Sequence, residues 1–403
     1  MVQRRVAVTG IGVVSALGGD TCQFWKALRE GRPGIAPFES PELSSLRFSR
    51  AAETRGFDPC AHFQEKQIDF LDRFAQFAVV AARQAVLQSG IEWTGELREN
   101  TAVITGCCVG GQSTQDTGFV DLYRLGRNRV HPLSIPRVMS SAGASHISME
   151  MGLSGPVYTV STACSSASHA LGQAFWMVRA GQADMAIAGG SEAPFSYGIL
   201  KAWEAMRVVS PDTCRPFSRN RSGMILGEGG AMMVLEPLEA AQARGATVLG
   251  EITGFGMSSD AAHITQPSAS GAAKAMRLAL RDAGIPPEAV GYINAHGTGT
   301  IANDVSETSA IRSVFGAHAG RLAVSSTKSM HGHALGAAGA LELAATLLAL
   351  HHGILPPTAN FAEPDPECDL DVIPNRARCQ AVEYALSNSF AFGGLNAVLA
   401  VRA

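Results

Sequence analysis

Short apolar runs alternate with longer amphipathic stretches along most of the chain. The short runs, rich in Val, Ile and Ala, predict β-strands at residues 5–9, 101–105, 185–188, 232–236 and 291–294. Apolar residues with helical spacing predict helices over residues 74–88, 165–179, 237–244, 271–283 and 336–350. Because the strands are apolar throughout and alternate with helices, the pattern favours an α/β fold whose sheets are covered on both faces.

Two segments have to be weighed as targeting or membrane signals. The basic residues 3–5 before the apolar residues 6–8 imitate the start of a secretory signal, but Gly10 and Gly12 interrupt the apolar run. We expect the strand to end there in a turn. In the C-terminal half, the most apolar stretch, residues 343–350, is far shorter than the roughly 20 residues that cross a membrane. The sequence therefore predicts a soluble, cytoplasmic protein.

The chain contains an internal repeat. When the sequence is shifted by 164 positions, residues 160–172 align with residues 324–336, and seven of the thirteen pairs are identical. Both copies run from a strand through a Ser/Thr turn into a helix of small residues. No proline-rich linker separates the two parts of the chain. We therefore predict an ancient duplication in which two similar halves, residues 1–245 and 246–403, share one packed body.

Composition excludes several classes of protein. Of 403 residues, 46% are hydrophobic and 17% are charged, so the chain can bury a large core and is not disordered. The 32 basic and 35 acidic residues leave a net charge of −3, which gives no overall field for nucleic acid or anionic lipid. The eight cysteines form no CxxC pair, which argues against a zinc site, and they are too sparse for a disulfide scaffold.

Three short motifs carry candidate chemistry. Cys164 stands where a strand ends and a helix begins, and helix N-terminal amides there should lower the pKa of its thiol. His296, in Asn-Ala-His-Gly-Thr-Gly-Thr, and His333, in Lys-Ser-Met-His-Gly-His, each follow an apolar strand. Taken singly, Cys164 could be an ordinary buried cysteine and each histidine a satisfied loop residue.

Taken together, these motifs resemble those of the condensing enzymes of the thiolase fold, specifically β-ketoacyl acyl-carrier-protein synthase II and its polyketide relatives. The resemblance runs from the Arg-Arg-Val-Ala-Val-Thr-Gly segment at residues 4–10 to the Asn-Ser-Phe-Ala-Phe-Gly-Gly-Leu-Asn segment at residues 388–396, nearly the whole chain. It implies two duplicated βαβαβ-type halves that form a five-layered αβαβα core. It also implies decarboxylative condensation of malonyl-carrier with an acyl chain.

The resemblance implies a role for each motif residue. Cys164 matches the nucleophile that accepts the acyl chain, and His296 and His333 match the pair that binds the malonyl thioester carbonyl and stabilises the enolate. Lys328 matches a lysine that orders the site, with Glu342 as its carboxylate partner. The amides of Cys164 and Phe392 match a second oxyanion hole. The remaining matches are a mobile gate, Phe390, Phe392, Gly393 and Gly394, and two structural carboxylates, Asp304 and Glu307.

Substrate and partner expectations also come from the resemblance. Val109, Ser134 and Trp203 match acyl-pocket positions, with Ser134 replacing a common Phe on a segment that lines the pocket across a dimer. Residues 200–207 and 212–218 resemble nodulation-type ketosynthases, which favours an unusual, unsaturated acyl chain. The acidic acyl carrier protein is expected to dock on Lys66, Arg127, Arg129 and Arg207.

Some features leave alternatives open. His331 replaces a small residue and is expected to be an ordinary outward-facing histidine, although an added hydrogen bond to His333 or a metal site is conceivable. Ala391 replaces a usual Gly and should stiffen the gate. Gly10-Ile11-Gly12 lacks the third glycine of a dinucleotide site.

The resemblance also implies how the enzyme is assembled and supplied. It implies no resident cofactor or metal, with 4′-phosphopantetheine arriving on the carrier, and a homodimer or heterodimer. A chain-length-factor-like, non-catalytic partner and a thiolase or initiating synthase are the other candidates.

Overall fold

The computed structural model describes residues 3–40 and 45–403, and a set of long strands forms its framework. These strands are β1 (Val6–Ser15), β4 (Thr101–Gly106), β5 (Val157–Val160), β6 (Met185–Glu192), β7 (Gly229–Pro237), β8 (Gly250–Ser259), β9 (Val290–Asn294), β10 (Ala323–Ser325), β13 (Tyr384–Ala391) and β14 (Leu395–Arg402). Short pairs are formed by β2 (Ala36–Pro37) with β3 (Arg50–Ala51) and by β11 (Ile354–Leu355) with β12 (Arg378–Cys379).

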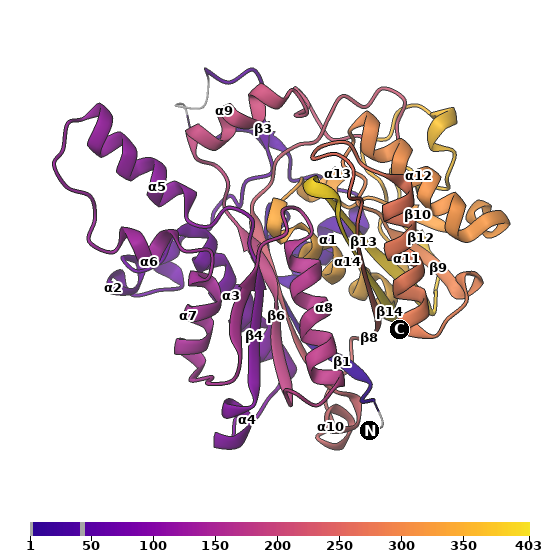
Figure 1. Cartoon of the computed structure of the whole chain (residues 1–403), viewed down its shortest axis with the longest axis horizontal. Coiled ribbons are helices and arrows are strands. Elements are labelled where there is room, and N and C mark those ends of the chain that lie inside the picture. Colours follow the sequence, from indigo (N-terminus) through magenta and orange to yellow (C-terminus); the bar gives the residue numbers. More distant parts are fainter. Residues whose placement is uncertain (1–2, 41–44) are drawn as a thin grey trace.

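Helices connect the strands and cover the sheet (Figure 1). They are α1 (Thr21–Glu30), α2 (Glu65–Ile68), α3 (Arg73–Ser89), α4 (Gly95–Glu99), α5 (Gln112–Phe119), α6 (Ser134–Val138), α7 (Ala142–Met151), α8 (Ser166–Arg179), α9 (Tyr197–Met206), α10 (Leu238–Ala243), α11 (Ala269–Ala283), α12 (Ile301–Phe315), α13 (Lys328–His331) and α14 (Ala338–His352). Each helix and strand predicted from the hydrophobic pattern is present, and apart from β1 their ends differ by a few residues.

The strand order shows the same arrangement twice. The main sheet runs β10-β9-β13-β14-β8-β1-β7-β6-β4-β5, so each half contributes its strands in the same order outward from the centre. The halves join where residues 6–8 of β1 pair antiparallel with residues 250–252 of β8. The two copies of the sequence repeat begin on the two edge strands, β5 and β10, and lead into α8 and α14. The repeated segments therefore occupy equivalent places in the fold.

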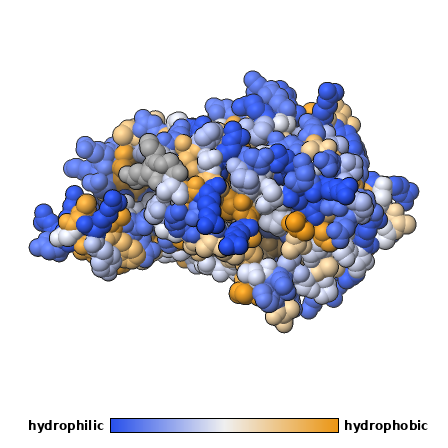
Figure 2. All heavy atoms as spheres, turned by 90° about the horizontal axis from the view of Figure 1, so that it is seen from above, coloured by the Kyte–Doolittle hydropathy of each residue, from blue (hydrophilic) through white to orange (hydrophobic). Residues whose placement is uncertain are grey.

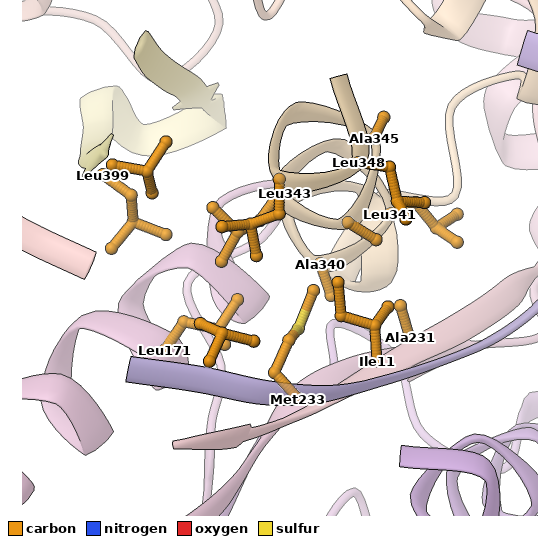
Figure 3. Close-up of a cluster of buried hydrophobic side chains, with 14 of the residues drawn as sticks. Ile11, Leu171, Ala231, Met233, Ala340, Leu341, Leu343, Ala345, Leu348 and Leu399 are labelled. Atoms are coloured by element: carbon orange, nitrogen blue, oxygen red, sulfur yellow. The ribbon is translucent and has the colours of Figure 1, made fainter. Parts of the chain in front are cut away.

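The elements are stacked in five layers. Helices α3 and α7 pack on one side of the N-terminal strands, and α11 packs against β8 and β14 with α12 beside it. Helices α8 and α14 contact each other and lie between the two sets of strands. Figure 3 shows Ala340 and Leu343 of α14 among side chains from both halves, including Met233 and Leu399. This middle layer is the largest apolar core.

One segment meets the length and hydropathy of a membrane span. It comprises 18 residues, Leu335–His352, and includes α14. Because 89% of this segment is buried inside the protein, it is the central core helix.

Strand β1 is longer than the sequence predicts. The expected break at Gly10 and Gly12 is wrong, because the strand continues through both glycines to Ser15. A Cβ atom on Gly12 would lie 1.8 Å from the carbonyl oxygen of Ala81, and one on Gly10 would lie 2.0 Å from that of Ala85. These glycines therefore let the backbone of α3 pack directly on β1, which explains their spacing without a nucleotide.

An arm formed by residues 112–139 projects from the N-terminal half (Figure 1). It contains α5 and α6 and carries exposed apolar side chains, among them Tyr123 and Ile135, which are 81% and 73% exposed. Figure 2 shows hydrophobic residues interspersed with polar ones at this end of the molecule. Such an apolar surface on a projecting arm is typical of a protein–protein interface.

The packing of α3 on β1 predicts opposite outcomes for two glycine substitutions. Gly12→Ala should lower the free energy of unfolding by about 1–3 kcal/mol, because the added methyl group meets backbone atoms that cannot rotate away. Gly95→Ala is the matched control, since Gly95 lies in a helix and no atom beyond its chain neighbours and its own helix backbone lies within 4 Å of the place that its Cβ would take. Its expected effect is neutral or slightly stabilising, by about 0.5 kcal/mol. Urea unfolding midpoints measure both, and equal stabilities would contradict the packing argument.

Candidate active site

A cavity between the two halves brings the three candidate catalytic side chains together. Cys164, His296 and His333 all line it, although they are far apart in sequence. Its other lining residues are Trp203, Val208, Met224, Asp260, Ile264, Thr265, Gln266, Pro267, Thr298, Thr300, Ala302, Asn303, Phe390, Ala391, Phe392, Gly394 and Asn396. No local pattern in the sequence points to residues 260–267, whereas Thr298 and Thr300 belong to the His296 motif.

Cys164 lies on a strained turn between β5 and α8. The preceding residue, Ala163, has a φ of 51°, a conformation that L-residues rarely adopt. Ser166 stabilises the turn by accepting a hydrogen bond from the Thr162 amide at 2.9 Å and donating to the Ala163 carbonyl at 2.6 Å. The Ser165 hydroxyl donates to the carbonyl of Leu395 at 2.9 Å, which ties the turn to the C-terminal half. The turn thus presents the thiol to the cavity.

Burial dominates the electrostatics of the Cys164 thiol. Desolvation raises its pKa to about 11, although the Lys328 charge and the Phe392 amide act in the opposite direction. The sequence-based expectation of a lowered pKa is therefore wrong for the free thiol. The helix N-terminus lies in the protein interior. There the loss of hydration destabilises the thiolate by more than the nearby amides stabilise it.

The two histidines face each other as neutral rings. Their ring centroids are 5.5 Å apart and their planes are nearly perpendicular, at 85°. Burial lowers the pKa of both His296 and His333 well below the ordinary value, and the Lys328 charge lowers both further. Lys328 Nζ lies 3.2 Å from His296 Nδ1, and because an ammonium group only donates, His296 carries its proton on Nε2. Neutral imidazoles of this kind can donate hydrogen bonds to a carbonyl oxygen.

A buried ion pair supports His296. Lys328 and Glu342 are both fully buried and directly hydrogen-bonded to each other. Lys328 also donates to the His296 carbonyl oxygen at 2.7 Å. Burial raises the pKa of Glu342 to about 7. The structure thus brings the two residues into the contact that the resemblance implied.

Two further carboxylates hold the loop that carries His296. Glu307 accepts hydrogen bonds from the amides of His296 and Gly297 at 2.9 and 2.8 Å. Asp304 accepts from the amide of Gly299 at 3.2 Å and from that of Phe217 at 2.8 Å. Both carboxylates are buried. They contact the loop backbone and do not line the cavity.

The gate residues form a tight turn between β13 and β14. Gly393 and Gly394 have φ values of 82° and 68°, which favour glycine. The ring of Phe392 stacks on Trp203, with centroids 6.1 Å apart and an interplanar angle of 25°. Phe390 packs edge-on against His296 at 6.0 Å. The Gly393 amide donates to the carbonyl oxygen of Ile264 at 2.7 Å, which links the gate to residues 260–267.

His331 is not outward-facing, so that expectation is wrong. It is fully buried, and its Nδ1 donates to the Gly332 carbonyl oxygen at 2.8 Å. Its Nε2 lies 2.9 Å from the Thr327 hydroxyl, which donates to it. Burial lowers the pKa of His331 to about 3. Both ring nitrogens are occupied by the protein, and the ring packs near Phe24 at 6.3 Å, so His331 is a core residue behind the site.

The candidate residues of the acyl pocket do not all lie at the catalytic cavity in the single chain. Trp203 lines the catalytic cavity, but Val109 and Ser134 do not. Val109 follows β4 and is half-buried, whereas Ser134 begins α6 on the projecting arm and lines a different hollow. The resemblance places Ser134 at a pocket shared across a dimer, and its position on an exposed arm leaves that prediction open.

The candidate docking residues are all exposed but do not form one patch in the single chain. Arg207 follows the last residue of α9 and lines a surface groove next to Trp203, together with Arg47. Arg127 pairs with Asp121 on the projecting arm, and Arg129 is two residues further along. Lys66 lies on α2. Of the four, Arg207 alone lies beside a residue of the catalytic cavity among the described contacts.

The raised pKa of the Cys164 thiol predicts a steep pH dependence of its alkylation. Because the thiolate is the reactive form, the iodoacetamide rate at Cys164 should rise about tenfold for each pH unit between about pH 7 and 10. Lys328→Met removes a charge that lowers this pKa, so alkylation at fixed pH should become slower. Peptide-resolved mass spectrometry measures both rates, with exposed Cys22 as the internal reference. A plateau already reached at about pH 8 would contradict the raised pKa.

Comparison with known proteins gives a consistent picture along the whole chain. The family model of the β-ketoacyl synthase N-terminal domain matches residues 3–241, and that of the C-terminal domain matches residues 249–362. Nodulation protein E of Rhizobium sp. (strain N33) is 49% identical over 99% of both chains. The 3-oxoacyl-[acyl-carrier-protein] synthase 2 of Coxiella burnetii is 43% identical over 99% of this chain and 98% of its own.

The fold agrees with these sequence matches. A solved structure described as the ishigamide ketosynthase/chain length factor superposes with a TM-score of 0.94 at 38% identity, covering 99% of both chains. The duplicated, layered arrangement is accordingly the thiolase fold that the motifs implied. With both domain models matched and relatives aligned from end to end, the chain belongs to the β-ketoacyl synthase family.

Proposed function

We propose that this chain catalyses decarboxylative condensation of malonyl-carrier protein with an acyl chain held on Cys164, using His296 and His333 as its oxyanion donors. The observation that carries the assignment is the convergence of these three side chains on one cavity. The family match supplies the reaction class, β-ketoacyl synthesis. The roles that we propose for the individual residues come from the family resemblance, and their common position on this cavity supports them.

The first half-reaction transfers the acyl group. The Cys164 sulfur attacks the thioester carbonyl of the acyl-carrier, an S–C bond forms, and the carrier's S–C bond breaks. The carrier thiol leaves with the proton that Cys164 gives up. The amides of Phe392 and Cys164, both of which favour the Cys164 thiolate, are the donors that we propose for the transient oxyanion. Because the free thiol has a raised pKa, proton loss accompanies the attack.

The second half-reaction forms the new carbon–carbon bond. His296 and His333 donate hydrogen bonds to the thioester carbonyl of malonyl-carrier, which stabilises the enolate formed as the carboxylate leaves as CO2. The enolate carbon attacks the acyl carbonyl on Cys164, a C–C bond forms, and the S–C bond breaks. The Cys164 sulfur leaves as a thiolate and takes a proton from water to restore the thiol. Neutral rings suit this step, because each ring has to provide one N–H donor and neither ring has to carry a net charge.

An unsaturated acyl chain is the substrate that we propose. The protein is 49% identical to a nodulation protein E and 43% identical to a 3-oxoacyl-acyl-carrier-protein synthase 2. Trp203 and Phe392 stack at the cavity wall, and Phe390 lines the same cavity. Flat aromatic faces pack well against a planar, conjugated chain. Ser134, where enzymes that take saturated chains commonly have Phe, also supports a different acyl chain.

The partners and surroundings follow from this chemistry. We propose that an acyl carrier protein delivers both substrates on its 4′-phosphopantetheine arm, so the enzyme needs no resident cofactor or metal. Arg207 lies beside the cavity and is our first candidate for carrier docking, with Lys66, Arg127 and Arg129 as the further candidates. We propose a dimer, either of two identical chains or with a related ketosynthase or chain-length factor, in the cytoplasm. A non-catalytic, chain-length-factor-like role for this chain is the alternative.

The proposed roles predict which variant loses which half-reaction. Wild-type protein incubated with acyl-carrier should gain the mass of one acyl group on the Cys164 peptide. Cys164→Gln should gain none and lose condensation, yet retain malonyl-carrier decarboxylation. His333→Ala should keep the acyl adduct but decarboxylate about 100-fold more slowly, because it lacks one oxyanion donor. Mass spectrometry and CO2 release measure the two steps.

Two outcomes of this experiment would overturn the proposal. A wild-type protein without an adduct on Cys164 would favour the non-catalytic alternative. Full condensation by Cys164→Gln would exclude that residue as the nucleophile. Running the same reactions after dialysis against EDTA tests the cofactor part, since activity that depends on an added metal would contradict it.

Competition between two acyl-carrier substrates tests the chain preference. With saturated and 2,4-dienoyl chains of equal length, kcat/KM should favour the dienoyl substrate about fivefold, because aromatic contact with a conjugated chain is worth roughly 1 kcal/mol. Trp203→Leu should reduce the preference while leaving saturated chains in use. Equal or better use of the saturated chain by the wild-type enzyme would overturn the preference that we propose.

A further inference from the structure

Another buried carboxylate, Glu192 at the end of β6, has no role in the mechanism above. It is fully buried, and it forms no ion pair with any described Lys, Arg or His residue. It accepts hydrogen bonds from three backbone amides, those of Cys108 at 2.6 Å, Gly336 at 3.1 Å and Val109 at 3.3 Å. The Cys107 thiol donates a fourth hydrogen bond to Glu192 at 3.4 Å. Burial of a carboxylate without a cationic partner is unfavourable, so we ask what function these compensating contacts serve.

These contacts join three segments that meet near the catalytic cavity. The first is the end of β6, the second is the turn after β4 that includes Val109, and the third is the turn at Gly336 that leads into α14. Gly336 lies three residues after His333. The segments touch so closely that a Cβ atom on Gly336 would lie 2.5 Å from both Glu192 Oε2 and the Cys108 amide nitrogen. The place where these three segments meet, here called the joint, has no room for an added side-chain atom.

The joint fixes His333 from its C-terminal side. On the other side, the His333 amide donates to the Ile225 carbonyl oxygen at 2.7 Å, and its carbonyl accepts from Gly227 at 2.9 Å. Between His333 and Gly336, Leu335 has a φ of 44°, a strained value that the surrounding contacts must maintain. The position of the His333 ring therefore depends on two anchors, and Glu192 supplies one of them.

The ionised form of Glu192 is the one that satisfies this site. Burial raises its pKa to about 7, and the amide hydrogen bonds act against that rise. Backbone amides only donate, and a carboxylate only accepts, so every contact is matched. A glutamine of the same shape would place N–H donors against amide donors.

We infer that Glu192 is a positioning residue for His333, acting through the turn that ends at Gly336. The inference rests on the proposed function, because it concerns the decarboxylation step assigned to His333. Glu192 makes no hydrogen bond with the Cys164 turn among the described residues. Loss of its charge should therefore affect malonyl decarboxylation and leave acylation of Cys164 in place.

The test is Glu192→Gln, with the two half-reactions measured separately well below the melting temperature. Malonyl-carrier decarboxylation should slow about 100-fold in kcat at unchanged KM, because a displacement of about 1 Å removes a well-placed donor. Acylation of Cys164 in a single turnover should stay within about threefold of the wild-type rate, because Glu192 makes no direct hydrogen bond with the Cys164 turn among the described residues. Gly336→Ala, which enters the same joint from the other side, should give the same split.

Glu236→Gln is the matched control for stability. Glu236 is also a buried carboxylate, but it lies on β7 away from the cavity, where it binds Thr9 and Arg244. Its loss should lower the melting temperature without separating the two half-reactions. Proportional loss of both half-reactions in Glu192→Gln and Gly336→Ala, or no loss in either, would overturn the positioning role. If wild-type protein itself neither acylates Cys164 nor decarboxylates malonyl-carrier, the proposed function fails instead.

Discussion

The buried ion pair between Lys328 and Glu342 is the interaction on which the candidate site depends. Two charges inside the protein lose their hydration, and only direct pairing and good hydrogen bonds compensate for that loss. Lys328 uses its remaining donors on the ring and carbonyl oxygen of His296. The pair therefore sets the tautomer of His296 and adds to the field that keeps His333 neutral. Without either partner, an uncompensated charge would lie directly behind both imidazoles.

Small residues allow the two halves to approach closely enough for this arrangement. Helices α8 and α14 lie between the sheets, and a Cβ atom on Gly339 would lie only 2.1 Å from the Ser168 hydroxyl oxygen. Gly172 likewise lies against the ring of Phe255, with no room for a side chain. The turns that lead into both helices carry cavity residues, so their close packing brings Cys164 of one half toward the histidines of the other. Part of the high glycine content of the chain therefore serves this central layer.

The duplication gives equivalent places to residues with different tasks. In the repeat, Cys164 aligns with Lys328, and His169 aligns with His333. His169 is buried behind the nucleophile turn, with its Nδ1 3.0 Å from the Thr162 hydroxyl. The N-terminal copy thus presents a thiol and uses its histidine to support the turn. The C-terminal copy presents histidine to the cavity and uses lysine as the support, so one site is built from both copies.

The alternating elements, the repeat, the turn at Cys164 and the motifs of both histidines could all be predicted from the amino-acid sequence, because they depend on periodicity and on residues close together in the chain. The direction of the thiol pKa, the burial of His331 and the contacts of Glu192 became evident only in the folded molecule. Each of these depends on how much water distant segments exclude and on which backbone groups they place nearby. Desolvation and close packing are properties of the assembled layers, so no local pattern of residues encodes them.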